Sequence, residues 1–170
     1  MLKVNTVRNG LEYIIKEMHF NKVLLPKYLC NSLYIMLDKK QIEYKFYNIN
    51  RKLLPIIEEK IDSDTVVVII NYFGMLNNEQ LFQLKKIYGN IIVDNTQSFF
   101  QQPIEGIPTL YNCRKYFGVS DGAYISGISN TNDYDKLDFD RSYNRLLHLF
   151  GRMECGASLF YNQFKITMKN

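Results

Sequence analysis

The chain has 170 residues, of which 46% are hydrophobic and 22% are charged. This balance is typical of a folded globular protein and excludes an intrinsically disordered one. No apolar run approaches the roughly 20 residues that span a bilayer. The net charge is only +4, and 21 basic residues are interleaved with 17 acidic ones, so nothing indicates a nucleic-acid partner. We expect one domain without a membrane segment.

The three cysteines are Cys30, Cys113 and Cys155. They are widely spaced and odd in number, which argues against a disulfide framework and against a four-cysteine zinc site. The first five residues lack the apolar stretch of a secretory signal. We therefore expect a cytoplasmic protein with no metal.

Short apolar runs alternate with amphipathic helical patterns, which is typical of an α/β fold. The runs predict strands near 3–7 and at 23–25, 44–49, 65–71, 91–94, 109–112 and 123–126. The strand at 65–71 is apolar on both faces, as expected of a central strand covered by helices on both sides. Helices are predicted over 9–19, 29–37, 53–61 and 81–88, the last ended by Gly89. We expect a three-layer, mostly parallel sheet of about seven strands with helices on both faces.

The pattern changes from about residue 143. Apolar residues then recur every three or four positions, which predicts one long amphipathic helix: Leu146, Phe150, Met153, Ala157, Phe160 and Phe164. This divides the chain into a core over 1–141 and a terminal helix over 142–170. His19 and His148 lie on predicted helices without metal-spaced partners, and we expect them to be surface or interface residues.

Two charged residues follow predicted strands. Asp94 ends the strand at 91–94, and Lys115 comes three residues after the strand at 109–112. Ligands of open α/β sheets bind beyond the carboxyl ends of the strands, where these two side chains would share one rim. A carboxylate that holds a pyridine nitrogen protonated and a lysine that forms a Schiff base together suggest a pyridoxal phosphate site. A crowded or buried lysine also loses its proton more readily.

A plainer interpretation of the same two residues stays open. Asp94 could cap the following helix, and Lys115 could be a solvated surface charge. A receiver domain also has an aspartate and a lysine at strand ends. It needs an acidic pair after its first strand, which neither 7–9 nor 26–28 supplies.

An ordered series of segments resembles the DegT/DnrJ/StrS family of sugar aminotransferases, which are fold-type I pyridoxal phosphate enzymes. The central segments are Asp94-x-x-Gln97 and the run from Asn112 to Gly122 (NCRKYFGVSDG). The resemblance extends from about residue 5 to 168 through further segments, namely VRNGLEY at 7–13, LPKYLC at 25–30, FYNIN at 46–50, NYFG at 71–74 and GRME at 151–154.

The resemblance implies roles for individual residues. Lys115 would be the Schiff-base lysine and the acid/base, Asp94 would pair with the pyridinium nitrogen, and Gln97 would hydrogen-bond the phenolic oxygen of the ring. The backbone at Val7 and Arg8, which opens a helix, would help to hold the phosphate.

Two further residues have open interpretations. Cys30 falls where the family places a residue against the ring face, and it could equally be a small buried hydrophobe. Tyr72 could approach the site or be an ordinary aromatic side chain at a strand end.

The chain departs from the family pattern at the phosphate. The family usually has Gly at the position of Val7 and a serine shortly before the lysine. Residues 110–113 offer no serine, so Asn112 or Cys113 would have to replace it, and both departures predict weaker phosphate binding. Retention of Lys115, where the dehydratase branch has histidine, favours transamination.

The resemblance also implies partners and a missing part. Family members convert keto-sugar nucleotides to amino sugars for polysaccharide or lipopolysaccharide synthesis, with an amino-acid donor, and form homodimers. They carry a C-terminal small domain, which we expect this chain to lack after its large domain. The alternative function is a truncated, inactive member that at most binds pyridoxal phosphate.

Overall fold

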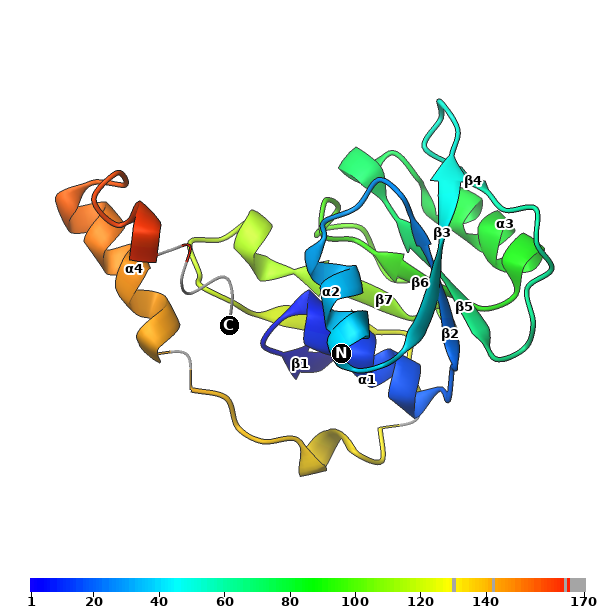
Figure 1. Ribbon diagram of the computed structural model, residues 1–170, viewed down its shortest axis with the longest axis horizontal. Coiled ribbons are helices and arrows are strands. Elements are labelled where there is room, and N and C mark those ends of the chain that lie inside the picture. Colours follow the sequence, from blue (N-terminus) through cyan, green and yellow to red (C-terminus); the bar gives the residue numbers. More distant parts are fainter. Residues whose placement is uncertain (130, 142, 164, 166–170) are drawn as a thin grey trace.

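The computed structural model describes residues 1–129, 131–141, 143–163 and 165. The described residues form one eight-stranded sheet in the order β1-β8-β7-β6-β5-β2-β3-β4 (Figure 1). The strands are β1 (Leu2–Val4), β2 (Lys22–Pro26), β3 (Glu43–Ile49), β4 (Pro55–Ile56), β5 (Thr65–Ile70), β6 (Ile91–Asp94), β7 (Thr109–Asn112) and β8 (Ala123–Ser126). All of the predicted strands are present, and the sheet gains β4.

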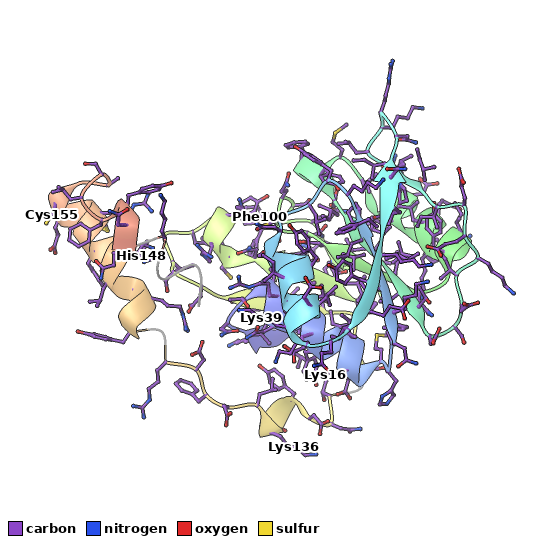
Figure 2. All side chains as sticks on the ribbon, viewed as in Figure 1. Lys16, Lys39, Phe100, Lys136, His148 and Cys155 are labelled. Atoms are coloured by element: carbon purple, nitrogen blue, oxygen red, sulfur yellow. The ribbon has the colours of Figure 1, made fainter. Side chains whose placement is uncertain are left out.

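Helices cover both faces of the sheet, as the sequence predicts. Successive strand residues point to opposite faces, so the all-apolar β5 has Val66 and Val68 in one core and Val67 and Ile69 in the other. The first core also takes side chains of α1 (Val7–Glu17) and α2 (Ser32–Lys39), and the second takes those of α3 (Asn78–Tyr88). Figure 2 shows Lys16 on α1 and Lys39 on α2, on the side of the molecule that these two helices form.

The parallel part of the sheet brings the ends of its central strands to one edge. β3, β2, β5, β6 and β7 pair in parallel, with Asp94 opposite Ile70 of β5 and Leu110 of β7. β8 runs antiparallel to β7, and β1 runs antiparallel to β8. Gly10 lets α1 approach this part of the sheet closely, because a Cβ atom there would lie 2.8 Å from a methyl group of Leu110. The start of α1 and the ends of β6 and β7 therefore lie close together.

The helix predicted over 53–61 is wrong. Residues 50–56 form a turn followed by β4, which pairs antiparallel with β3. The Asn50 side chain accepts the N–H groups of Lys52 and Leu54, and Leu53 has a positive φ of 61°. These side chain–backbone hydrogen bonds favour the turn over the helix that the apolar spacing suggested.

The long terminal helix is shorter than predicted. α4 (Tyr143–Cys155) stops before Gly156, which has a φ of 95° that ends the helix. The chain then folds back, and a Cβ atom at Gly151 would lie 2.2 Å from the ring of Phe160. Phe164 is outside the described residues. α4 lies apart from the sheet at the left of Figure 1.

The two histidines differ from each other. His19 is exposed in the turn after α1, as expected, but it is not helical. His148 lies on α4 with 2% of its surface exposed, so its assignment as a surface residue is wrong (Figure 2).

Two general features of the described chain bear on its chemistry. None of the helices in these ranges has the length and hydropathy to cross a membrane, and the same residues hold no cluster of three potential metal ligands. Cys30, Cys113 and Cys155 are all free thiols.

Candidate functional site

A cavity of about 790 Å³ opens at the carboxyl ends of β5, β6 and β7. Its volume is that of a typical site for a small molecule or a cofactor. The wall includes all seven site residues that the sequence proposed, which come from four separate segments of the chain: Val7, Arg8, Cys30, Asp94, Gln97, Asn112 and Lys115. The fold thus brings together residues that the sequence pattern could only place at strand and helix ends.

Asp94 is the buried acid of this cavity, with 6% of its surface exposed. Its Oδ1 accepts the backbone N–H of Thr96 at 2.8 Å. Burial raises the pKa of the carboxyl, and the hydrogen bonds from Thr96 oppose the rise. No cation among the described residues contributes to this pKa shift. The next seven residues form turns and not a helix, so Asp94 is not a helix cap. A buried carboxylate in this setting is stabilised by a cationic ligand.

Gln97 is held by the loop that follows β5. Its Oε1 accepts the backbone N–H of Phe73 at 2.9 Å, which leaves the Nε2 group as a hydrogen-bond donor. Phe73 has a positive φ of 55° and also lines the cavity. The contact therefore fixes both a loop of unusual backbone conformation and the direction of the glutamine amide.

Asn71 connects this loop to the loop after β6. It is completely buried, and its Nδ2 lies 2.7 Å from Oε1 of Gln101, 3.1 Å from Oδ1 of Asn95 and 3.2 Å from the carbonyl oxygen of Leu76. Its Oδ1 accepts the N–H of Leu76 at 2.9 Å. Asn71 thus positions the loops that carry Tyr72, Phe73 and Gln97.

The N-terminus of α1 forms another wall. Thr6 caps the helix by accepting the N–H of Asn9 at 3.3 Å, and Val7 and Arg8 form the first turn. The first N–H groups of a helix have no partner within it and favour an anion. The neighbouring carbonyl of Asn5 accepts the N–H of Gly122 at 2.6 Å, which ties this helix start to the segment before β8.

Lys115 ends a short 3-10 helix, η2 (Cys113–Lys115), directly after β7. Asn112 caps η2, because its Oδ1 accepts the N–H of Arg114 at 3.0 Å, and its Nδ2 group remains as a donor. Lys115 lines the cavity and its side chain is exposed, so it is not a buried lysine.

Cys30 and Tyr72 both line the cavity. Cys30 is exposed, with Sγ 3.2 Å from Oγ of Ser32, so it is not a small buried hydrophobe. Tyr72 has 4% of its surface exposed, and its hydroxyl donates to the carbonyl oxygen of Tyr28. Burial, with Tyr28 and Asp94 nearby, raises the pKa of Tyr72.

Sequence reasoning missed several residues of the wall. Arg114, Thr96, Tyr28 and Phe73 all contact the cavity, and the ring of Tyr28 stacks on that of Tyr72 with centroids 5.5 Å apart. The available signal was that each lies within two residues of a predicted site residue or of Tyr72. The direction of each side chain depends on contacts between distant segments.

Solved structures share this arrangement of elements. The chain is similar to the sugar aminotransferase CalS13 from Micromonospora echinospora, with a TM-score of 0.57, 14% identity and coverage of 86% of this chain and 45% of that one. NtdA from Bacillus subtilis, solved with bound cofactor PMP, has a TM-score of 0.62 and 15% identity, and the match covers 79% of this chain and 34% of NtdA. The histidinol-phosphate aminotransferase from Clostridium acetobutylicum has a TM-score of 0.60 and 17% identity, and the match covers 96% of this chain and 56% of that enzyme.

These likenesses establish the fold. The chain has the three-layer α/β fold of the corresponding part of these proteins. It spans between 34% and 56% of their length. No model of a known protein family matches the chain, and no curated protein sequence matches it either.

Replacing Asn71 tests whether the buried amide holds the cavity loops. Asn71→Leu leaves the backbone of Leu76 and the amides of Asn95 and Gln101 without this partner, and we expect the free energy of unfolding to fall by about 3 kcal/mol. Urea denaturation measures the change. The control is Asn132→Leu at an exposed position, with an expected change within about 0.5 kcal/mol. Equal effects of the two substitutions would contradict this role.

The raised pKa of Asp94 predicts a pH-dependent stability of the cofactor-free chain. A carboxyl with a raised pKa in the folded state favours folding below its ordinary value of 3.8, and loses that contribution as the pH rises through the folded value. Asp94→Asn keeps the acceptor for Thr96 and removes the charge. We expect the variant to gain stability over the parent chain as the pH rises towards neutral. Urea denaturation of both proteins across this pH range measures the gain. A difference in free energy of unfolding between variant and parent that is constant with pH would refute the prediction.

Proposed function

We propose that this chain binds pyridoxal phosphate and acts as an aminotransferase of the DegT/DnrJ/StrS type. The observation that carries the proposal is the placement of Asp94, a buried carboxylate, in the same cavity as Lys115. Pyridoxal phosphate, when bound, supplies an electron sink for the carbanion formed at the substrate carbon. PMP bound to NtdA, which shares the fold, supports the choice of cofactor.

Asp94 fits the ring nitrogen of this cofactor. Its buried carboxylate needs a positive partner, and a protonated pyridine nitrogen provides one. Thr96 hydrogen-bonds this carboxylate, with its N–H at 2.8 Å from Oδ1, and the two carboxylate oxygens have further acceptor capacity for the pyridinium proton. Asp94 would thereby keep the ring nitrogen protonated and orient the ring.

Lys115 and Gln97 fit two other groups of the cofactor ring, the carbonyl and the phenolic oxygen. The amine of Lys115 would hold the cofactor at its carbonyl carbon, with loss of water. Once an incoming amino group displaces it, the freed amine would move a proton between the substrate carbon and the cofactor carbon. The free Nε2 group of Gln97 would donate to the phenolic oxygen, since its Oε1 is already occupied by Phe73. The exposed position of Lys115 gives an incoming amino group access to it.

The proposed reaction transfers an amino group from an amino acid, with glutamate as the expected donor, to a keto-sugar nucleotide. The support is the ordered series of motifs around Asp94, Gln97 and Lys115 and the fold shared with the sugar aminotransferase CalS13. Three free thiols fit a reducing compartment such as the cytoplasm.

We also propose that the chain forms a homodimer. Large apolar side chains are exposed on α4, where Phe150 has 57% and Met153 has 84% of its surface accessible. An apolar surface of this kind favours association.

Substitution of Lys115 tests the cofactor. The parent chain mixed with pyridoxal phosphate should develop the visible absorbance of a lysine-bound cofactor, and Lys115→Ala should lose it completely. The control is Lys39→Ala, which removes an exposed lysine of α2 outside the cavity (Figure 2) and should keep the band. Absence of a band in the parent chain, or a band unchanged in Lys115→Ala, would reject the proposal.

Addition of glutamate separates the active enzyme from an inactive member of the family. A chain capable of the first half of the reaction converts the lysine-bound absorbance to that of the amine form of the cofactor and releases 2-oxoglutarate. A stable band with no 2-oxoglutarate favours the alternative of a chain that only binds the cofactor.

Sedimentation velocity tests the homodimer. We expect a dimer at micromolar concentration, and Phe150→Ser with Met153→Ser should shift it to monomer because the apolar contact is lost. A parent chain that stays monomeric at high concentration would disprove the proposal.

A further inference from the structure

A ring of polar contacts holds Asn5, the residue before the cap of α1. Its Nδ2 group donates to Oδ2 of Asp140 at 2.7 Å, and its Oδ1 accepts the Nδ2 group of Asn9 at 2.8 Å. Its carbonyl oxygen accepts the N–H of Gly122 at 2.6 Å. Asn5 and Gly122 both line the cavity. These contacts therefore fix one wall of the cavity at the start of α1.

Arg145 closes this ring from α4. Its Nε lies 2.9 Å from Oδ2 of Asp121, and its Nη2 donates to Oδ2 of Asp140. Asp140 accepts from the side chain of Asn5, and Asp121 directly precedes Gly122, which donates to the carbonyl of Asn5. Arg145 therefore joins the two segments that hold Asn5.

Both ion pairs of Arg145 are partly shielded from water. The side chain of Arg145 is 27% exposed, against 17% for Asp121 and 37% for Asp140, and such pairs are screened less by salt than fully exposed ones. The hydrogen bond from Asn5 lowers the pKa of Asp140, burial opposes this, and the hydrogen bond from Arg145 lowers it further. A guanidinium group presents its donors in a rigid fork, so Arg145 sets the two carboxylates in fixed positions.

The segment that carries Asp140 is also fastened to the sheet. The hydroxyl of Tyr134 donates to the carbonyl oxygen of Lys3 and accepts its N–H, both at 2.8 Å. The ring of Tyr134 packs edge-on against Tyr13 of α1, with centroids 6.2 Å apart. Residues 131–141 thus lie against β1 and α1, and Asp140 is held in a defined place.

We propose that Arg145 is a positioning residue for the cofactor cavity, acting through Asp140 and Asp121 on Asn5 at the start of α1. This inference rests on the proposed function, in which the start of α1 offers its first N–H groups to the cofactor phosphate. Arg145 is not part of the described cavity wall. It sets the place of these donors without touching the cofactor.

Hydrogen exchange of the cofactor-free chain tests the positioning by itself. We expect Arg145→Gln to speed exchange about threefold or more at Gly122, because opening the ring releases its acceptor Asn5, and to leave the amides of β5 unchanged. The control is Lys136→Gln, which breaks an exposed ion pair with Asp133 in the same segment (Figure 2) and should leave both regions unchanged. Unchanged exchange at Gly122 in Arg145→Gln, or an equal rise in β5, would overturn the proposal.

Comparison of pyridoxal with pyridoxal phosphate tests the consequence for the cofactor. We expect Arg145→Gln to lose about threefold or more of the preference for the phosphorylated form, because the N–H groups at the start of α1 shift. Arg145→Lys should recover part of this preference, since it keeps the charge without the planar fork. A general loss of stability weakens the binding of both forms equally. An unchanged preference in Arg145→Gln would therefore overturn the proposal.

A double-mutant cycle tests the route through Asn5. Asn5→Ala removes the side chain that Asp140 holds, so Arg145→Gln should change the phosphate preference less in that background than in the parent chain. Circular dichroism verifies that each variant is folded. Asp140→Ala, which removes the acceptor shared by Asn5 and Arg145, gives an independent test where Arg145→Gln fails to fold. Equal effects of Arg145→Gln in the two backgrounds would overturn the proposal.

The two proposals fail in different ways. If neither form of the cofactor produces a visible band with the parent chain, the proposed function fails, and exchange at Gly122 still decides whether Arg145 holds the start of α1. If the parent chain binds the cofactor and Arg145→Gln keeps the parent's exchange rates and phosphate preference, only the positioning role fails.

Discussion

Burial of the Asp94 carboxylate at the end of β6 is the constraint on which the rest of the site depends. β5 and β7 enclose this strand end, so the acid is removed from water while Thr96 hydrogen-bonds it, with the backbone N–H at 2.8 Å. Such a group costs stability when it ionises alone, and a cationic ligand relieves that cost. The position of Asp94 thus links the packing of the central sheet to the chemistry of the cavity.

The other walls of the cavity are built by contacts between distant segments. Asn71 fixes the loop after β5 to the loop after β6, and that contact directs Gln97. The carbonyl of Asn5 holds the segment before β8 against the start of α1. Four regions of the chain converge in this way, and the hydrogen-bonding direction of the Gln97 amide is fixed by this convergence.

Much of this arrangement could be predicted from the sequence because its signals are local. The all-apolar run of β5 identified the central strand, and Asp94 and Lys115 followed strands at a shared edge. The hairpin at 50–56 could not be predicted from apolar spacing, because the Asn50 side chain decides it. The end of α4 at Gly156 likewise depends on backbone conformation, since Gly156 has a φ of 95°.

Chemical trapping of the bound cofactor tests the central claim most directly. Reduction of the chain with borohydride in the presence of pyridoxal phosphate, followed by peptide mass spectrometry, identifies the lysine that carries the cofactor. The account predicts one pyridoxyl group at Lys115, with labelling there reduced in Asp94→Asn because the ring loses its charged partner. Label spread over surface lysines, or labelling of Lys115 that is unchanged in Asp94→Asn, would contradict it.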